Sequence, residues 1–334
     1  MEEKIKISLS KTCYQILMKD TENFEFYKKD GSLNRNAFLN TLIENYCDAY
    51  AAQQKNTLQL LSKRVSALHG VRLKEVGEVC NEILNDLNRS QLENGEKLEV
   101  SLSFRPTKES AYSVEYIRDC LSVGTTVSNY FRMMLLSYSQ QPQDAREKII
   151  FRKQYETIAR AIEEHKQIYF TIRGNSARQV SPYAVVSSKE ELYNYMLSES
   201  TDGTVHTNRL TRITNVSILN EDAHISQEAL PIFEKMQWLG PQYNFLPKEN
   251  YSIVVKLTAN GQRMFKVMYL HRPIPVSIEE DRYLFDCSEE QVFQYFCRFG
   301  EAAYIVKPKR LRERIKSFYD RGSELYRDDN PVKK

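Results

Sequence analysis

Arginine and tyrosine side chains are the residues of this sequence best suited to bind another molecule, and they recur between residues 169 and 212. An arginine guanidinium group binds phosphate oxygens bidentately, and a tyrosine ring stacks on an unpaired base. The structural alternative is that Arg178 and Arg212 pair with nearby carboxylates such as Glu190 or Glu191. The candidates for nucleic-acid or ligand binding are Arg178, Tyr195, Arg209 and Arg212, followed by Tyr169 and Tyr193.

The sequence offers no catalytic or metal-binding set of residues. It has no defensible Ser-His-Asp order, no glycine-rich phosphate loop and no pair of cysteines at C-x-x-C spacing. The six cysteines and five histidines are scattered, and Glu163, Glu164 and His165 are interpreted as a helix surface. We therefore predict a protein that is not an enzyme and needs no cofactor or metal ion, with reduced cysteines buried as small apolar groups.

The composition is typical of a globular protein of the cytoplasm. The 334 residues suffice for two or three domains, and the net charge of +3 means that any basic surface must come from local clustering. No apolar run is long enough to span a membrane, and the first residues lack the apolar core of a signal peptide. We expect a cytoplasmic protein that does not enter a membrane.

The elements that must position these residues begin with a repeated pattern. Residues 4–10 read KIKISLS and residues 97–103 read KLEVSLS, at an offset of 93 residues. Alternation of polar and apolar residues predicts a half-buried strand. At the same offset Gly31 corresponds to Gly124, and a helical pattern follows each glycine. The repeat therefore predicts two copies of one strand-helix-helix unit.

Two such units that pair their strands antiparallel resemble the ribbon-helix-helix fold, here with both units in one chain. In that family the exposed face of the two-stranded sheet enters the DNA major groove, and helix N-termini hold flanking phosphates. The resemblance implies that Ser32 and Thr125 stand at those helix starts. Because Glu99 takes the place of Lys6, symmetric reading of a palindrome is disfavoured. The alternative is a solvated strand pair that serves dimerisation. The exposed residues would be Lys4, Lys6, Ser8, Lys97, Glu99 and Ser101.

Hydrophobic periodicity predicts the remaining elements. Helical patterns cover about 32–50, 56–92 with a break near Gly70, 127–138 and 142–166. Four short strands with tight turns then predict a small antiparallel barrel, followed by a short helix and a linker. The four strands lie at 167–173, 177–187, 191–198 and 207–219, the helix at 227–236 and the linker at 241–249.

Residues 161–219 resemble a WYL domain. They contain, in the family's order, a helix end at Ala161–Ile162, an Arg-x-Val-x-Pro segment at 178–182 and an Arg-Leu-x-Arg-Ile segment at 209–213. The motif that names the family aligns with 194–196, where Asn194 replaces the tryptophan. The resemblance implies a small Sm-like β-barrel that places its arginines and tyrosines on one concave surface and binds nucleic acid or a nucleotide-like ligand.

The last 80 or so residues resemble the extension that follows many WYL domains, most clearly at 299–308. Strands at 251–257, 282–286 and 302–306 alternate with helices, which predicts a compact α+β sandwich. The basic helix that starts at Lys309 could contact phosphates, but packing on a second subunit is the favoured interpretation. The residues that would make that contact are Leu311, Ile315 and Phe318.

The predicted fold class is α+β in three parts. Residues 1–142 form the duplicated ribbon-helix-helix region, 143–240 a linker helix and the WYL barrel, and 241–334 the C-terminal extension. This order resembles the WYL accessory proteins of type VI-D CRISPR systems. The resemblance implies a non-enzymatic homodimer that binds single-stranded RNA and enhances an RNA-guided CRISPR ribonuclease, with the effector itself as a further partner.

Two other classes of protein stay open. A transcription regulator would bind duplex DNA with the ribbon and sense a nucleotide-like ligand with the barrel. A dimeric scaffold would have no nucleic-acid role, which the modest net charge permits.

Overall fold

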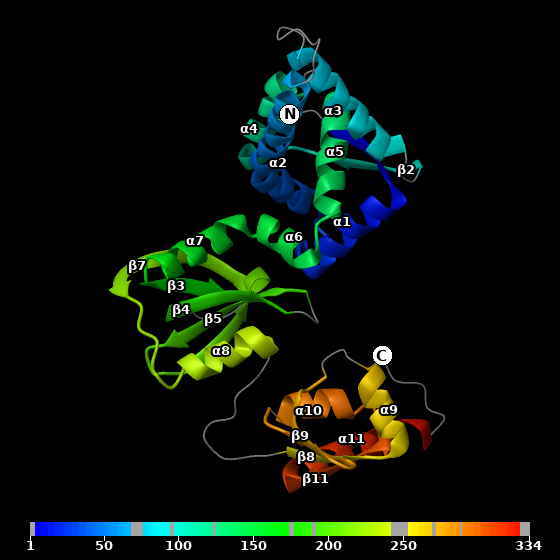
Figure 1. The fold of residues 1–334 in the computed structure, drawn as a ribbon, viewed down its shortest axis with the longest axis vertical. Helices are drawn as coiled ribbons and strands as arrows, with labels where there is room; N and C mark the ends of the chain where they lie inside the picture. Colours follow the sequence, from blue (N-terminus) through cyan, green and yellow to red (C-terminus); the bar gives the residue numbers. More distant parts are fainter. Residues whose placement is uncertain are drawn as a thin grey trace. The chain divides into compact units, whose positions relative to one another are not determined.

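The computed structural model describes residues 4–67, 76–93, 97–122, 125–173, 177–188, 192–241, 253–268, 272–287 and 289–327 (Figure 1). The chain divides into two compact units. One comprises Met1–Arg160, Thr171–Ser176 and Arg209–Val216, and the other comprises Ala161–Phe170, Ala177–Asn208 and Ser217–Lys334. The three-part division predicted from the sequence stays a prediction.

The first unit repeats the order strand, helix, helix. Its first copy is β1 (Ile5–Ser10), α1 (Lys11–Asn23) and α2 (Arg35–Ser66). After α3 (Val76–Glu93), the order recurs as β2 (Leu98–Phe104), α4 (Lys108–Tyr116) with a π-helical turn (Ile117–Leu121), and α5 (Val127–Ser139). The unit continues with α6 (Gln143–Ile150) and most of α7 (Arg152–Glu163).

Strands β1 and β2 form a two-stranded antiparallel sheet, as the repeated pattern predicts. Ser8 lies opposite Ser101, its own counterpart in the repeat, so a local twofold axis passes through this pair. Of the two glycines that the repeat relates, Gly124 lies outside the described residues. One face of the sheet is buried because the apolar residues alternate with polar ones. That face carries Ile7, Leu9, Leu102 and Phe104.

Helix α2 starts slightly later than predicted, at Arg35, while α5 starts at Val127 as predicted. Asn34 caps α2 by accepting a hydrogen bond from the backbone of Ala37, and Thr126 caps α5 in the same way. Ser32 instead binds the carboxylate of Asp30 through its backbone N–H at 2.9 Å and its hydroxyl group at 2.6 Å. The expected helix starts at Ser32 and Thr125 are therefore wrong, because the capping side chains belong to Asn34 and Thr126. The phosphate contacts expected at these helix ends stay a prediction.

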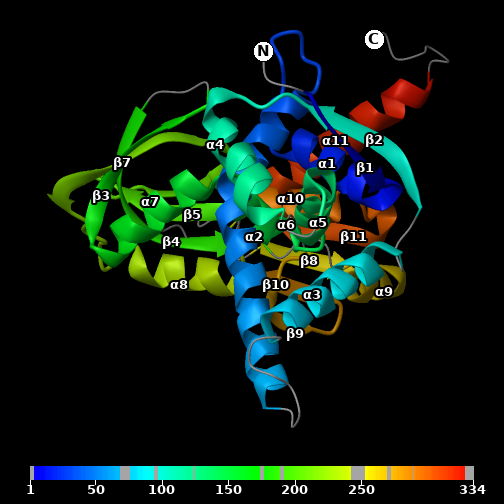
Figure 2. The ribbon, with the colours of Figure 1, turned by 90° about the horizontal axis from the view of Figure 1, so that it is seen from above.

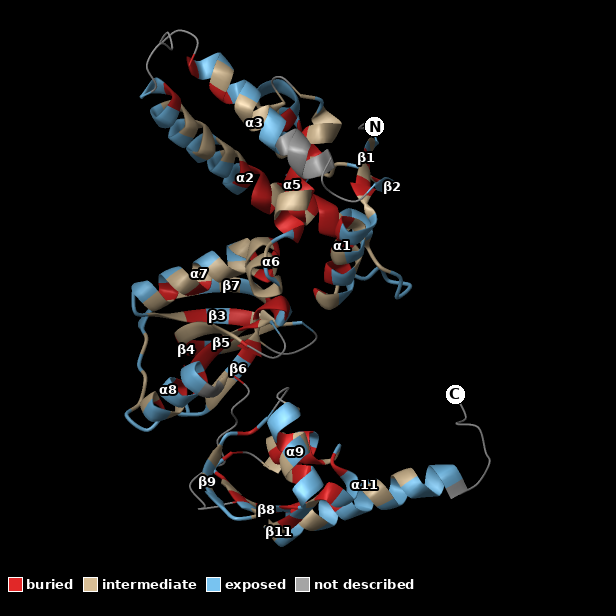
Figure 3. Ribbon diagram, turned by 45° about the vertical axis from the view of Figure 1, so that its right-hand side comes forward, coloured by how far each residue is buried: buried red, intermediate tan, exposed pale blue. Residues whose placement is uncertain are grey.

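Helix α2 is one continuous helix where two were predicted. Residues 51–55, AAQQK, all favour helix, so nothing interrupts the backbone after residue 50. Its buried residues lie mainly in its first half, and α3 runs beside its second half (Figures 2 and 3). The predicted break at Gly70 falls outside the described residues. A small cluster of Val65, Val76 and Cys80, with Leu58, Leu61, Val79 and Ile83 around it, joins the two helices.

Five strands form the sheet that follows α7. They are β3 (Lys166–Ile172), β4 (Ala177–Ser187), β5 (Asn194–Ser200), β6 (Val205–Arg209) and β7 (Ile213–Asp222), in the order β6-β5-β4-β3-β7. Four strands were predicted, and the difference arises because a 3-10 turn at Leu210–Arg212 divides the last one. Helix α8 (Leu230–Leu239) follows, and the ring of its Phe233 stacks on Tyr183 of β4 at 4.6 Å.

The C-terminal part is a four-stranded sheet with helices, as the predicted α+β class requires. Its strands are β8 (Ile253–Leu257), β9 (Pro275–Glu279), β10 (Arg282–Phe285) and β11 (Ala303–Lys307), in the order β11-β8-β10-β9. Its helices are α9 (Ala259–Val267), α10 (Glu289–Phe296) and α11 (Lys309–Arg327). Strand β9 was not predicted, and most of the predicted linker, from residue 242 on, lies outside the described residues.

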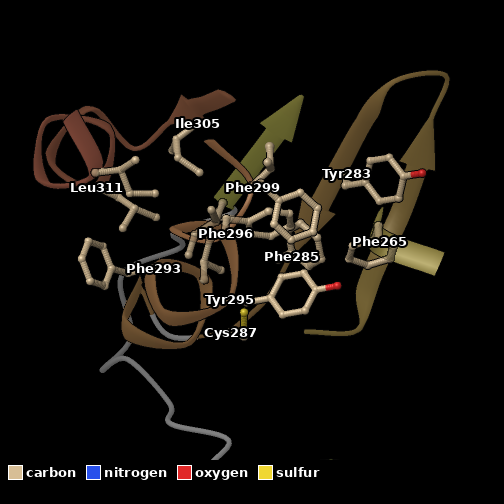
Figure 4. Close-up of a cluster of buried hydrophobic side chains, with 14 of the residues drawn as sticks. Phe265, Tyr283, Phe285, Cys287, Phe293, Tyr295, Phe296, Phe299, Ile305 and Leu311 are labelled. Carbon is tan, nitrogen blue, oxygen red and sulfur yellow. The ribbon is translucent and has the colours of Figure 1, made fainter. Parts of the chain in front are cut away.

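Aromatic rings fill the core of this part (Figure 4). Leu311 and Ile315 of α11 are buried in that same core, at 0% and 8% exposure. The expected packing of these two residues on a second subunit is therefore wrong, because their own chain covers them. Phe318 remains 41% exposed, with its ring 5.7 Å from that of Phe293.

Candidate nucleic-acid interface

The 3-10 turn between β6 and β7 is held by a buried carboxylate. Glu147 of α6 is fully buried and accepts hydrogen bonds from the backbone N–H of Thr211, at 3.3 Å, and from its hydroxyl group. Thr211 lies between Arg209 and Arg212 and is itself fully buried. Because a buried carboxylate is costly unless it is hydrogen-bonded, these bonds fix the turn that carries both arginines.

The residue before Glu147 fixes a different segment. Arg146 donates to both carboxylate oxygens of the fully buried Asp20, at 2.6 and 3.0 Å, and Tyr138 donates to the same carboxylate at 2.9 Å. Burial would lower the pKa of Arg146, but the hydrogen bond and charge of Asp20 raise it overall. Burial, together with Asp20, raises the pKa of the Tyr138 hydroxyl group. Helix α6 thus joins the end of α1 to the turn at Leu210–Arg212.

Three arginines contact the last residue of α1 and the segment that follows it. Arg209 donates to the carbonyl oxygen of Asn23 at 2.7 Å, and Arg212 faces Glu25 with its Nε 3.4 Å from Oε1. Arg173, at the end of β3, donates to the carbonyl oxygen of Glu25 at 2.9 Å and lies 3.3 Å from Oε2. The backbone N–H of Arg173 also binds the carbonyl oxygen of Arg212 at 2.9 Å. We call Arg173, Arg209 and Arg212 the arginine cluster.

Sequence reasoning found two members of the arginine cluster and missed the third. Arg173 precedes a Gly-Asn pair in the sequence, which by itself predicts only a loop. The expectation that Arg212 pairs with a carboxylate is met by Glu25. The two glutamates suggested as partners, Glu190 and Glu191, lie outside the described residues.

Arg178 lies elsewhere, in a chain of polar contacts. Its Nη1 is 3.4 Å from Nδ1 of His206, whose Nε2 is 3.1 Å from the hydroxyl group of Ser200, and that hydroxyl group donates to Asp202. Burial and then Arg178 lower the pKa of His206, while Asp202 raises it in part. A serine and a histidine at this distance could suggest a nucleophile and its base. An arginine stands where a catalytic carboxylate would orient the imidazole, so the arrangement does not support that chemistry.

Arg178 and Tyr195 do not share one face of the sheet. Tyr169 on β3 is 44% exposed, and Tyr193 and Tyr195 are half-buried. Val180 pairs with Ser200 and Val186 pairs with Tyr195. The register of β4 shifts between these two pairs, at Pro182–Ala184. Because residues alternate along β5, Tyr195 lies on the face opposite to Ser200, whereas Arg178 lies on the face of Val180 and Ser200. The structure brings Arg209 and Arg212 together but keeps Arg178 and Tyr195 apart.

The polar face of the two-stranded sheet carries the remaining candidates. Lys4, Lys6 and Lys97 are exposed, and Ser8 is half-buried. Two residues of α5 cover the outer edge of β1, since Ser128 donates to the carbonyl oxygen of Lys6 at 3.1 Å and Arg132 to that of Ser8 at 2.7 Å. This edge is therefore occupied, while the lysine side chains remain free to meet a ligand.

The described residues contain no metal-binding cluster and no membrane-spanning helix. Among them no three His, Cys, Asp or Glu side chains come close enough together to hold a metal ion. In the same residues, no helix has the length and apolar character needed to cross a membrane.

Comparison with known proteins places the arginine cluster in a defined domain. The model of the WYL domain matches residues 153–218, so the WYL domain predicted from the sequence is confirmed. The fold as a whole is similar to a solved structure described as "Crystal structure of a CRISPR Cas-related protein". The similarity has a TM-score of 0.73 at 19% identity and covers 98% of this chain and 95% of that chain.

A second solved structure, "Proteasome accessory factor B/C (PafBC) of Arthrobacter aurescens", matches with a TM-score of 0.28 at 17% identity, over 70% of this chain and 38% of that chain. The comparison with curated proteins found no match.

Proposed function

We propose that this protein is a non-enzymatic accessory protein that binds single-stranded RNA and enhances cleavage by an RNA-guided type VI CRISPR ribonuclease. The observation that carries the proposal is the arginine cluster. Three guanidinium groups meet at one end of the WYL sheet, where Glu25 is the carboxylate that faces two of them. Such a concentration of positive charge suits a phosphate backbone.

Two structural interpretations accompany this proposal. The two strand-helix-helix copies form an internally completed ribbon-helix-helix unit, supported by the Ser8–Ser101 pairing, and the five-stranded sheet is an Sm-like barrel. The similar fold of the CRISPR Cas-related protein supports the CRISPR context. We propose that the chain acts as a homodimer in the cytoplasm.

Binding measurements with three labelled nucleic acids test the proposal. Single-stranded RNA, single-stranded DNA and duplex DNA are titrated at several salt concentrations, and we expect the tightest binding to single-stranded RNA. The Arg209→Ala plus Arg212→Ala variant should bind RNA more weakly. The slope of log affinity against log salt should fall by about 1.4, because each lost phosphate contact removes ~0.7. Tight duplex binding with weak RNA binding would reject the proposal.

The exposed lysines in and just before β1 and β2 favour one other function. A regulator that reads duplex DNA would place Lys4, Lys6 and Lys97 against the phosphates or base edges of the major groove. Under that function the Lys4→Ala plus Lys6→Ala variant loses duplex binding, while the Arg209→Ala plus Arg212→Ala variant keeps it. The two double variants therefore separate the two functions in one assay.

A further inference from the structure

The carboxylate of Glu25 lies between two arginines of the WYL domain. Its Oε1 is 3.4 Å from Nε of Arg212, and its Oε2 is 3.3 Å from Nη1 of Arg173. Each carboxylate oxygen therefore faces a different guanidinium group. A phosphate group presents its oxygens to two arginines in the same manner, so the Glu25 carboxylate occupies a position that suits a phosphate.

The backbone presents Glu25 to the arginines in a defined way. Phe24 is fully buried, its ring meets that of Phe151 at 6.0 Å, and the ring of Phe26 meets that of Phe38 at 5.5 Å. Between these two anchors Glu25 has a φ of 60°, in the left-handed region that a glutamate rarely adopts. The segment is thus held by its two phenylalanines, and the side chain between them can move without moving the segment.

The contacts of the carboxylate are weak enough to be replaced. Both distances exceed the 2.7–2.9 Å or so that is usual for a charge-assisted hydrogen bond. The side chains of Arg173 and Arg212 are 46% and 59% exposed, so water screens both ion pairs. By contrast, the carbonyl oxygen of Glu25 accepts a bond of 2.9 Å from Arg173, which keeps that arginine in place when the carboxylate leaves.

We infer that Arg173 and Arg212 form a phosphate-binding pair and that the carboxylate of Glu25 is a built-in competitor, which an incoming RNA phosphate must displace. The inference rests on the proposed RNA binding and adds to it a third arginine and an acidic residue that lowers affinity. Since the competitor is anionic, it weakens the binding of single, weakly bound anions more than the binding of an RNA strand, which offers several phosphates at once.

The experiment compares Glu25→Gln with a matched control. Glu44 has the same side-chain exposure as Glu25, 27%, and pairs with Lys153 at 2.7 Å, so Glu44→Gln makes the same change of net charge away from the arginine cluster. Labelled single-stranded RNA is titrated into both variants and the native protein. Glu25→Gln should bind about fivefold more tightly than Glu44→Gln, the gain expected when a solvent-exposed ion pair is released. Adding Arg173→Ala and Arg212→Ala to Glu25→Gln should abolish the gain.

A second readout does not depend on RNA. The melting temperature is measured in inorganic phosphate and in chloride of equal ionic strength, and phosphate should raise it more for Glu25→Gln than for Glu44→Gln. If RNA binds the native protein but Glu25→Gln and Glu44→Gln behave alike, the inference is overturned and the proposed function stands. If no variant binds RNA but phosphate selectively stabilises Glu25→Gln, the proposed function fails and the phosphate-binding pair remains. If neither readout distinguishes Glu25→Gln, the inference is overturned.

Discussion

Replacing Asp20 by asparagine should destabilise the first unit strongly. The native carboxylate is fully buried and accepts hydrogen bonds from Nε and Nη2 of Arg146, whose side chain is 11% exposed, and from the hydroxyl group of Tyr138. An asparagine keeps the shape but removes the charge, so the guanidinium group loses its counterion in a buried site. Breaking a buried ion pair in this way costs about 3–5 kcal/mol. For a unit of this size that corresponds to a fall in melting temperature of about 6–20 °C.

Urea unfolding, followed by circular dichroism, measures this loss. The control is Glu44→Gln, whose partner Lys153 has a 76% exposed side chain, and which should lose at most about 1 kcal/mol. Adding Arg146→Met to Asp20→Asn should recover part of the stability, because it removes the buried guanidinium charge that has lost its counterion. A loss below about 1 kcal/mol for Asp20→Asn, equal to that of the control, would refute the argument that this buried pair fixes the end of α1 to α6.

Three further predictions test other contacts. Thr211→Val removes the hydroxyl donor to the buried Glu147 and should cost about 1–3 kcal/mol in denaturant unfolding while weakening RNA binding; unchanged stability would show that the turn is held otherwise. Gly261→Ala would place a Cβ 2.1 Å from a backbone oxygen, so α9 must shift, and we expect the free energy of unfolding to fall by about 1–3 kcal/mol. The control is Gly322→Ala in α11, where a Cβ would meet nothing within 4 Å, and there the free energy of unfolding should rise by up to about 1 kcal/mol. Burial lowers the pKa of His206, so the unfolded state takes up protons first and the stability of the fold falls as the pH drops below about 6.5. The melting temperature of His206→Gln should therefore fall less over this pH range than that of the native protein. Equal falls in the two melting temperatures would contradict the argument.

Local patterns were enough to predict most elements and the pairing of the ribbon strands. The strict alternation around Ile7 and Leu102 specifies which face of each strand is buried, and the repeat specifies that the two strands are partners. The WYL motif at 209–213 identified Arg209 and Arg212 as candidates, but the 3-10 turn at Leu210–Arg212 that carries them was predicted as part of one strand. Such short-range patterns predict local structure well because they depend on residues that are close together in the sequence.

The contacts that form the arginine cluster could not be predicted in this way. Glu25 and Arg173 are 148 residues apart, and no periodicity links them. The positive φ of Glu25 has no signal in the sequence either, since a glycine or an asparagine would be the expected residue there. The missed strand β9 begins with a proline, which disfavours a strand inside a sheet, and its apolar residues Val276 and Ile278 are exposed rather than buried.

The pairing of β1 with β2 inside one chain also changes how the ribbon responds to dilution and to mutation. Strands from two separate chains would part as the protein concentration falls, whereas these two are tethered and stay paired at any concentration. A substitution in a pair of identical chains would appear on both strands, but here it alters only one. Lys6 and Glu99 show the outcome, because two positions that correspond in the repeat carry opposite charges. Each half of this ribbon can therefore be modified independently of the other.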